Sequence, residues 1–299
     1  MTGLSNMDKC KIAITGSAGF IGKNLFKTLS QPYTVSGISR RISPTTTHSC
    51  DITLQKIHPV LDEIQPKIIV HCAALTNVDF CEENPGQAWL MNVTGTYNLV
   101  EWCRRNNAKM IYISTDYVYA GETNNYNESS ECAPVDEYGR TKLAAEYLVR
   151  SLPNHLILRP TVVFGYEEDG KNFFMQMLAL KEPRKIIDDQ LSNPTDAQVL
   201  SEYVQRAIEK DIEGIYVATG PETINRYDFA MLIAEVFNID KKLILRTKTH
   251  ELNQKAKRPL SNGTSSSKIR EILKYACPTL RDSLVQYKKN MEENGLLKK

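Results

Sequence analysis

The chain has little that would tie it to a metal ion, a disulfide framework or a membrane. Its seven cysteines are an odd number without a Cys-x-x-Cys pair, and its five histidines are scattered. This pattern argues against structural disulfides and zinc sites, and it suits a reducing compartment. The N-terminus lacks the apolar stretch of a signal peptide, and no run reaches membrane-spanning length. We therefore expect a cytoplasmic protein without a bound metal or a membrane contact.

An excess of either charge is also missing. The 37 lysines and arginines nearly balance the 35 aspartates and glutamates, for a net charge of +2. Such a balance gives no basic surface for nucleic acid. A length of 299 residues suits one large domain or two closely packed ones.

The most informative pattern that is present lies near the N-terminus. A β-branched run at 11–15 ends in three glycines spaced G-x-x-G-x-x-G, and an amphipathic segment follows at 20–29. Glycine allows a tight turn and a close approach of phosphate to the backbone, and a helix N-terminus offers free amides to it. The spacing differs from the usual G-x-G-x-x-G, but the strand–turn–helix context predicts a dinucleotide site. The residues expected to hold the pyrophosphate are Gly16, Gly19, Phe20, Ile21 and Gly22.

A second motif, Tyr138-Gly139-Arg140-Thr141-Lys142, opens a helical run. Residues four apart share one face of a helix. A nearby ammonium lowers the pKa of a tyrosine, so this pair can supply an acid or base for proton transfer. The alternative is a solvated helical face with an incidental tyrosine.

A third element is the apolar run 110–114, which leads into Thr115 and Asp116. Ligands of open α/β sheets bind beyond the carboxyl ends of the strands. Thr115 is therefore placed to bind a substrate oxygen. The alternative role is a strand-end cap.

Strand and helix alternate through the first half of the chain. Strand-like runs lie at 11–15, 33–38, 68–72, 110–114 and 155–159, and helical runs at 20–29, 57–65, 88–105 and 137–150. Alternation of this kind predicts an α/β protein of Rossmann type, with a doubly wound parallel sheet and helices on both faces. Within 88–105, core packing is expected of Leu90, Val93, Tyr97, Val100 and Trp102.

The pattern loosens after residue 160. Helices are expected near 173–180, 197–208, 227–237 and 283–293, short strands near 215–218 and 243–245, and a loop at 255–267. We expect a dinucleotide-binding domain at 8–163 with a return segment at about 196–220. A smaller α/β substrate-binding domain would comprise 164–195 and 221–299.

The residues after the second strand bear on the cofactor. NAD sites usually place a carboxylate about 20 residues after the glycine motif, to bind the ribose 2′-hydroxyl. Here Ser39, Arg40 and Arg41 follow the strand instead. Guanidinium groups pair well with a 2′-phosphate. NADP(H) is therefore the preferred cofactor, and NAD(H) stays open, since both arginines could simply face solvent.

Several further segments match one family. They are AALTNVDFCE at 73–82, STDYVY at 114–119, residues 134–142, GKNF at 170–173, DDQLSNPT at 188–195 and Arg258-Pro259. With the motifs above, they resemble the extended short-chain dehydrogenase/reductase family, and within it the dTDP-4-dehydrorhamnose reductases and their sugar-nucleotide relatives. The match spans nearly the whole chain in order.

The resemblance implies an enzyme that uses NADPH to reduce the C4 ketone of a 4-keto-6-deoxyhexose on a nucleoside diphosphate. Tyr138 would protonate the nascent alkoxide, Lys142 would bind the nicotinamide ribose and tune Tyr138, and Thr115 would orient the ketone. The cofactor contacts would also include Asp51, Ile52, Ala73 and Ala74. The substrate wall would comprise Thr76, Val78, Thr115, Asp116, Tyr138 and Asn172.

Related activities are less well matched. Sugar-nucleotide 4,6-dehydratases carry Asp-Glu after the catalytic threonine, but here Tyr117 follows Asp116. Bifunctional epimerase-reductases place a cysteine near that position, and neither Cys81 nor Cys132 has that context. A tryptophan typical of the reductases is missing from 159–164, so the particular hexose stays open. A non-catalytic role, like that of the regulatory beta subunit of methionine adenosyltransferase, also stays open, as does a homodimer.

Overall fold

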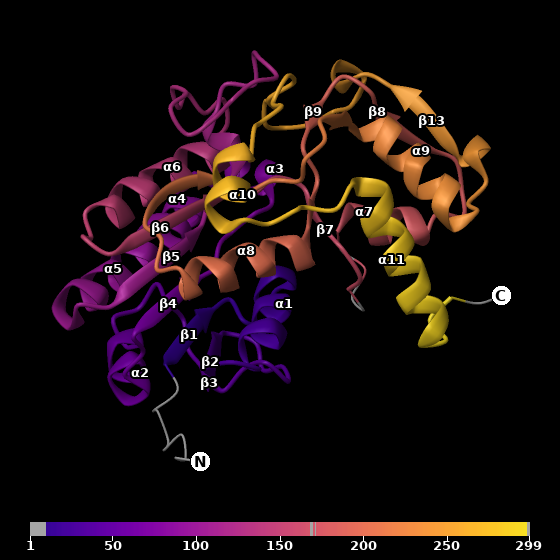
Figure 1. Cartoon of the computed structure of the whole chain (residues 1–299). Coiled ribbons are helices and arrows are strands. Elements are labelled where there is room, and N and C mark those ends of the chain that lie inside the picture. The colour runs from indigo at the N-terminus through magenta and orange to yellow at the C-terminus, as the bar shows by residue number, and fades with distance from the viewer. Residues whose placement is uncertain (1–9, 168–169, 171, 298–299) are drawn as a thin grey trace.

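The computed structural model describes residues 10–167, 170 and 172–297 (Figure 1). The predicted domain ends at 8–9 and 298–299, and Lys171 of the GKNF segment, lie outside the described residues. Over the described part, none of the helices is both long enough and apolar enough to cross a membrane.

A parallel sheet forms the centre of the molecule. Its seven strands, in spatial order, are β11 (Gly214–Val217), β6 (His155–Arg159), β5 (Lys109–Ile113), β4 (Ile68–His71), β1 (Lys11–Thr15), β2 (Thr34–Ser39) and β3 (His48–Ser49). The order runs outward in both directions from β1 and β4. The predicted Rossmann-type α/β fold is thereby confirmed. All strands present their carboxyl ends at the same edge.

Helices cover both faces of this sheet (Figure 1). Ile12 and Ile14 of β1 pack toward α1 (Phe20–Leu29), α8 (Ala197–Glu209) and α10 (Ser267–Leu273). Ala13, between them, packs toward α2 (Ile57–Ile64), α5 (Gly95–Asn106) and α6 (Glu137–Arg150). Since successive side chains of a strand point to opposite faces, strands buried on both sides read as continuous apolar runs.

One helical region differs from the prediction. The segment expected as a single helix at 88–105 consists of α4 (Pro85–Trp89), a π turn at Leu90–Thr94 and α5. Val100 and Trp102 are buried as expected, but Leu90 is 50% exposed and Tyr97 46%, so their core assignment was wrong. A π turn adds one residue to the helical repeat and thus rotates the side chains relative to a regular 3.6-residue pattern.

A smaller lobe follows β6 and has its own core. Its elements are β7 (Val163–Phe164), α7 (Phe173–Leu178), β8 (Arg184–Ile187), β9 (Leu191–Ser192), β10 (Thr195–Asp196), β12 (Ile224–Asn225), α9 (Arg226–Phe237), β13 (Ile244–Thr247) and α11 (Leu280–Glu293). Phe164, Phe174 and Phe229 are fully buried, and Phe164 makes edge-to-face ring contacts with the other two. Within the predicted return segment, β11 is the edge strand next to β6. The limits of the two domains stay a prediction.

The predicted loop at 255–267 is largely irregular and lies near the carboxyl end of β5. It makes parallel bridges to the loop 121–136, through Ser261 to Glu122 and Thr264 to Tyr126. Asn262 donates to the Asp116 carboxylate at 2.7 Å, just beyond the end of β5. This loop therefore joins the second lobe to the residues that follow the central strands.

Candidate active site

The glycine turn after β1 has the geometry that a bound phosphate requires. Gly16 has a φ of +72°, and a Cβ there would lie 2.7 Å from the Ala73 nitrogen. A Cβ at Gly22 would overlap the Gly16 carbonyl oxygen. Gly19 is the N-cap of α1 and carries no side chain to satisfy the first amides of the helix. These amides therefore remain suited to an anionic ligand.

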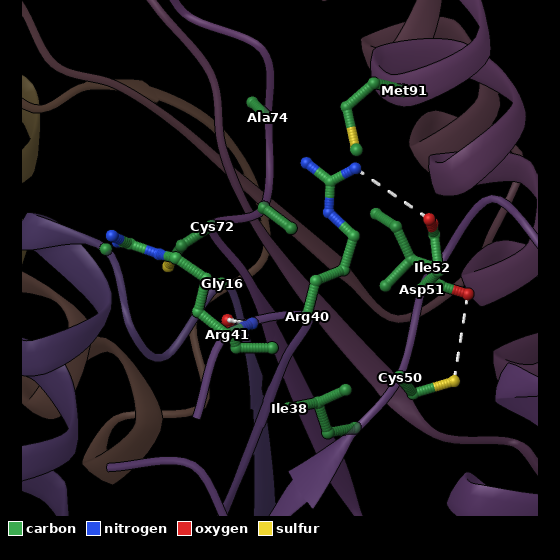
Figure 2. Close-up of a pocket in the computed structure, with 13 residues that line it drawn as sticks. Gly16, Ile38, Arg40, Arg41, Cys50, Asp51, Ile52, Cys72, Ala74 and Met91 are labelled. Atoms are coloured by element: carbon green, nitrogen blue, oxygen red, sulfur yellow. Dashed lines mark hydrogen bonds and ion pairs between the residues drawn. The ribbon is translucent and has the colours of Figure 1, made fainter. Parts of the chain in front are cut away.

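A cavity of about 240 Å³ opens beside this turn, above β1, β2 and β4 (Figure 2). Arg40 extends across it toward Asp51, with a guanidinium–carboxylate distance of 3.8 Å. Arg41 lies on the other side of Gly16 and donates to the Ala18 carbonyl at 3.2 Å. The cavity brings together nine of the predicted cofactor residues: Gly16, Gly19, Ser39, Arg40, Arg41, Asp51, Ile52, Ala73 and Ala74.

Asp51 is held as a carboxylate in this cavity. Burial alone would raise its pKa, but hydrogen bonds from the Thr53 amide and hydroxyl, with the charge of Arg40, keep the pKa below its usual value. Because Arg40 is 63% exposed, its pairing with Asp51 is screened by water and is easily exchanged for another anion.

A second cavity, of about 430 Å³, adjoins the first, since Gly16, Gly19, Cys72 and Ala74 line both. Phe20, Ile21 and Gly22 line it from the start of α1. Of the predicted substrate and catalytic residues, it brings together Thr76, Val78, Thr115, Asp116 and Tyr138. We refer to it as the catalytic cavity.

Local structure places the two hydroxyl groups of this cavity. Tyr138 lies in the first turn of α6, whose N-cap Asp136 accepts a hydrogen bond from the Gly139 amide at 2.8 Å. Thr115 follows β5, and its hydroxyl oxygen accepts from the Tyr117 amide at 3.2 Å. The strand end and the helix start thus bring both side chains to one wall, as the strand–loop–helix pattern predicts.

The pKa of Tyr138 differs from the sequence-based expectation. Burial raises it above the usual value of a phenol, and a hydrogen bond with Thr115 opposes this only in part. Lys142 was expected to lower this pKa. Its ammonium group instead donates to the Ile113 carbonyl at 2.8 Å and lies 4.1 Å from the centre of the Tyr112 ring. Tyr138 therefore keeps its proton at neutral pH, as a proton donor must.

Lys142 is almost completely buried and does not line either cavity. Burial lowers its pKa to about 7, while Glu146 and Cys72 act in the opposite direction. The predicted contact of Lys142 with a ribose therefore stays a prediction.

A buried ion pair supports the strand end from behind. Arg159 binds both carboxylate oxygens of Glu146, at 2.9 and 2.6 Å, and each side chain is at most 3% exposed. The Ser114 hydroxyl donates to the same carboxylate at 2.6 Å. Ser114 precedes Thr115, and Glu146 lies one turn beyond Lys142, so this pair fixes α6 against the end of β5.

The third cavity lies between the lobes, also about 430 Å³, and we refer to it as the second-lobe cavity. It shares Val78, Tyr117, Val162, Val163 and Arg226 with the catalytic cavity. Asn172, the sixth predicted substrate residue, lines it as the N-cap of α7. Among the residues that the structure describes, its wall carries the cationic side chains Arg184, Lys185, Arg226 and Arg258 and no carboxylate. This composition suits an anionic ligand.

Several of these lining residues were not found from the sequence. Arg184 and Lys185 lie on the short strand β8, and Arg226 is the first residue of α9; neither segment carries a motif of its own. Val162 occupies the segment that lacks the expected tryptophan. It has a φ of +42°, which is strained for a β-branched residue, and it lines both cavities.

The thiols do not offer an obvious acid or base. Cys81 is buried and donates to the Leu75 carbonyl, and Cys132 packs beside Val118, so neither lines the catalytic cavity. Cys72 does line it, but burial raises its pKa to about 12.

Fold and cavities together define the class: a dinucleotide-dependent α/β oxidoreductase with a Rossmann-type sheet and a second lobe over the carboxyl ends of its strands. The family profile described as the RmlD substrate binding domain matches residues 10–293. The chain belongs to that family.

Known proteins similar to this chain include two reductases and a subunit of a methionine adenosyltransferase. The probable low-salt glycan biosynthesis reductase Agl14 of Haloferax volcanii is 32% identical over 284 residues, which cover 91% of this chain and 95% of that protein. The crystal structure of dTDP-4-dehydrorhamnose reductase from Bacillus anthracis in complex with NADP matches with a TM-score of 0.86 and 29% identity, over 94% of this chain and 99% of the other. The mouse methionine adenosyltransferase 2 subunit beta is 30% identical over 78% of this chain and 74% of its own length.

Proposed function

We propose that this protein uses NADPH to reduce the C4 ketone of a nucleoside-diphosphate 4-keto-6-deoxyhexose. One observation carries the proposal: the wall with Tyr138 and Thr115 lies between a glycine turn suited to a pyrophosphate and a cationic cavity suited to a second nucleotide. Similarity to a reductase solved with NADP supports the choice of cofactor.

NADPH would supply the hydride. Gly16, Gly19 and the first turn of α1 would bind its pyrophosphate, and Arg40 would bind the 2′-phosphate. NADH stays a possible substitute of lower affinity, because the cavity also holds the Asp51 carboxylate that could bind a ribose hydroxyl.

The residues of the chain would position the ketone and provide the proton. The Thr115 hydroxyl would hold the carbonyl oxygen next to the phenol of Tyr138. Since burial keeps that phenol protonated, it can donate its proton to the alkoxide as charge develops there. The Lys142 ammonium lies behind this wall and would favour the phenolate that remains.

The substrate class follows from the charge and size of the two outer cavities. The hexose would lie against Thr76, Val78 and Tyr138, and its nucleotide would occupy the second-lobe cavity near Asn172. Anchoring a remote nucleotide in this way holds the reacting carbon in place and lowers the entropic part of the barrier.

A screen of NADPH oxidation tests the proposal. The substrates are 4-keto-6-deoxyhexoses on dTDP, UDP, GDP and CDP, each with and without prior treatment by a separate 3,5-epimerase. Turnover only after epimerase treatment supports a plain reductase, whereas turnover of the untreated sugar to a rhamnose-type product supports a bifunctional enzyme.

A regulatory role is the second candidate, because the mouse methionine adenosyltransferase 2 subunit beta is about as similar to this chain as the reductases are. Tight NADPH binding without turnover of any of these substrates, together with co-purification of a larger synthetase, would favour it over the enzyme.

We also propose a homodimer. Trp89, Leu90 and Tyr97 on α4–α5 and Tyr147 on the neighbouring α6 are 42–59% exposed, and clusters of exposed apolar side chains mark interaction surfaces. Light scattering should give twice the mass of one chain for the wild type, and the mass of a single chain for Tyr147→Glu.

A cytoplasmic location is a further part of the proposal. The seven cysteines are all unpaired, which suits a reducing compartment.

A further inference from the structure

Arg226 occupies the junction between the catalytic cavity and the second-lobe cavity. It is the first residue of α9, after the N-cap Asn225. Its guanidinium carbon lies 5.1 Å from the centre of the Phe173 ring, on the floor of the second-lobe cavity. Five of the described residues line both cavities, and Arg226 is the only charged one among these five.

The charge of Arg226 has no acidic partner among the residues that the structure describes. The other cations of the second-lobe cavity are engaged: Arg258 pairs with Asp79 at 2.9 Å, and Lys185 with Glu251 at 3.9 Å. Burial lowers the pKa of Arg226, with Tyr117 and Asp116 opposing. The Asp116 carboxylate thus offsets only part of the cost of desolvating this guanidinium, and an anionic ligand would offset more of it.

We propose that Arg226 binds the phosphate next to the sugar in the nucleoside-diphosphate substrate. This inference rests on the proposed function. The reacting carbonyl must reach Tyr138 in the catalytic cavity, and the cationic second-lobe cavity is left for the nucleoside. The phosphates join these two groups and must therefore pass the residues that line both cavities.

The position makes Arg226 a specificity-determining residue. A planar guanidinium offers two parallel donors to phosphate oxygens. The cation–π contact with Phe173 restrains this side chain at the junction of the two cavities. Arg184 is the competing anchor, but it lines only the second-lobe side and donates to Gln176 at 2.9 Å.

Binding of product nucleotides tests the proposal without turnover. Calorimetry in the presence of NADP⁺ would compare dTDP, dTMP and thymidine on the wild type, with UDP, UMP and uridine as a parallel series. The variants are Arg226→Gln, Arg226→Lys and Arg184→Gln. Arg281→Gln is the matched control, because it removes an exposed arginine of the same lobe that lines none of the cavities described above.

We expect Arg226→Gln to weaken the diphosphate about 10- to 100-fold and to leave the monophosphate and nucleoside within about twofold. Arg226→Lys should restore part of the loss, and Arg281→Gln should bind like the wild type. NADP⁺ affinity should be unchanged in all variants, which shows that they are folded.

Four results would overturn the proposal. An unchanged diphosphate affinity in Arg226→Gln, or an equal loss for monophosphate and nucleoside, would exclude a specific contact with the terminal phosphate. A larger loss of diphosphate affinity in Arg184→Gln would place that phosphate deeper in the second lobe. If the wild type binds NADP⁺ but none of the nucleotides, the proposed function fails together with this inference, which distinguishes that failure from the other three.

Discussion

Arg40 offers the sharpest prediction about cofactor choice. Its guanidinium lies 3.8 Å from Asp51 and is 63% exposed, so the present ion pair contributes little and can be replaced. A charge-assisted bond to a 2′-phosphate is worth about 1.5–3 kcal/mol. Solvent screening at this exposed position favours the lower end, so Arg40→Ala should weaken NADPH binding about tenfold or slightly more.

NADH provides the internal control, because it lacks the 2′-phosphate. Arg40→Ala should change NADH affinity less than about threefold, since only an exposed ion pair is lost. Asp51→Asn should strengthen NADPH binding, because it removes a carboxylate from beside the 2′-phosphate. One carboxylate charge and one phosphate charge about 4 Å apart repel each other by about 1 kcal/mol in water.

Fluorescence titration of both cofactors against wild type, Arg40→Ala, Asp51→Asn and the surface control Arg281→Gln measures these effects. Equal affinity of the wild type for NADPH and NADH would refute the reasoning. Parallel losses for both cofactors in Arg40→Ala would also refute it, because they would make Arg40 a structural residue.

Three further predictions concern the wall behind the catalytic cavity. Tyr138→Phe should bind NADPH normally but lose about 10²–10⁴-fold in turnover, and near-normal kcat would show that the acid is misassigned. Burial lowers the pKa of Lys142 to about 7. Between about pH 7 and 10 the unfolded chain therefore binds more protons at this group than the folded chain does, so the free energy of unfolding rises with pH in that window. Denaturant unfolding should therefore show wild-type stability rising relative to Lys142→Met across that window, and parallel curves would contradict the assignment. Arg159→Met should cost about 3–5 kcal/mol by leaving the buried Glu146 carboxylate unpaired. Adding Glu146→Leu should recover part of that loss in the same unfolding assay, and strict additivity would exclude a coupled pair.

The sequence predicted the elements that carry strong local signals. The limits of α1 and α6, at 20–29 and 137–150, agree with the structure, because a glycine turn and an Asp136 cap mark their starts. The prediction of a single helix at 88–105 was wrong, because a π turn alters the helical repeat and no change in residue type reveals it. β9, β10 and β12 have two residues each, too few for a period-two pattern to be recognised.

The candidate site shows the same division. Motif residues such as Gly16, Thr115 and Tyr138 were found because their spacing reflects strand–turn–helix geometry. Arg226 was missed, because its place at the junction of two cavities depends on how α9 packs against a loop more than 60 residues earlier. The pKa of Tyr138 was expected to be lowered, but burial raises it, and burial is a property of the packed site and not of the Tyr-x-x-x-Lys spacing.

Transfer of isotope from cofactor to sugar tests the central claim most directly. NADPH deuterated at the transferring position of nicotinamide C4 would be incubated with the protein and the 4-keto-6-deoxyhexose nucleotides, and the products analysed by mass spectrometry and NMR. We predict one deuterium at sugar C4 with the wild type and a strongly reduced yield with Tyr138→Phe. NADPH binding without deuterium at C4 of any of these sugars would contradict the account.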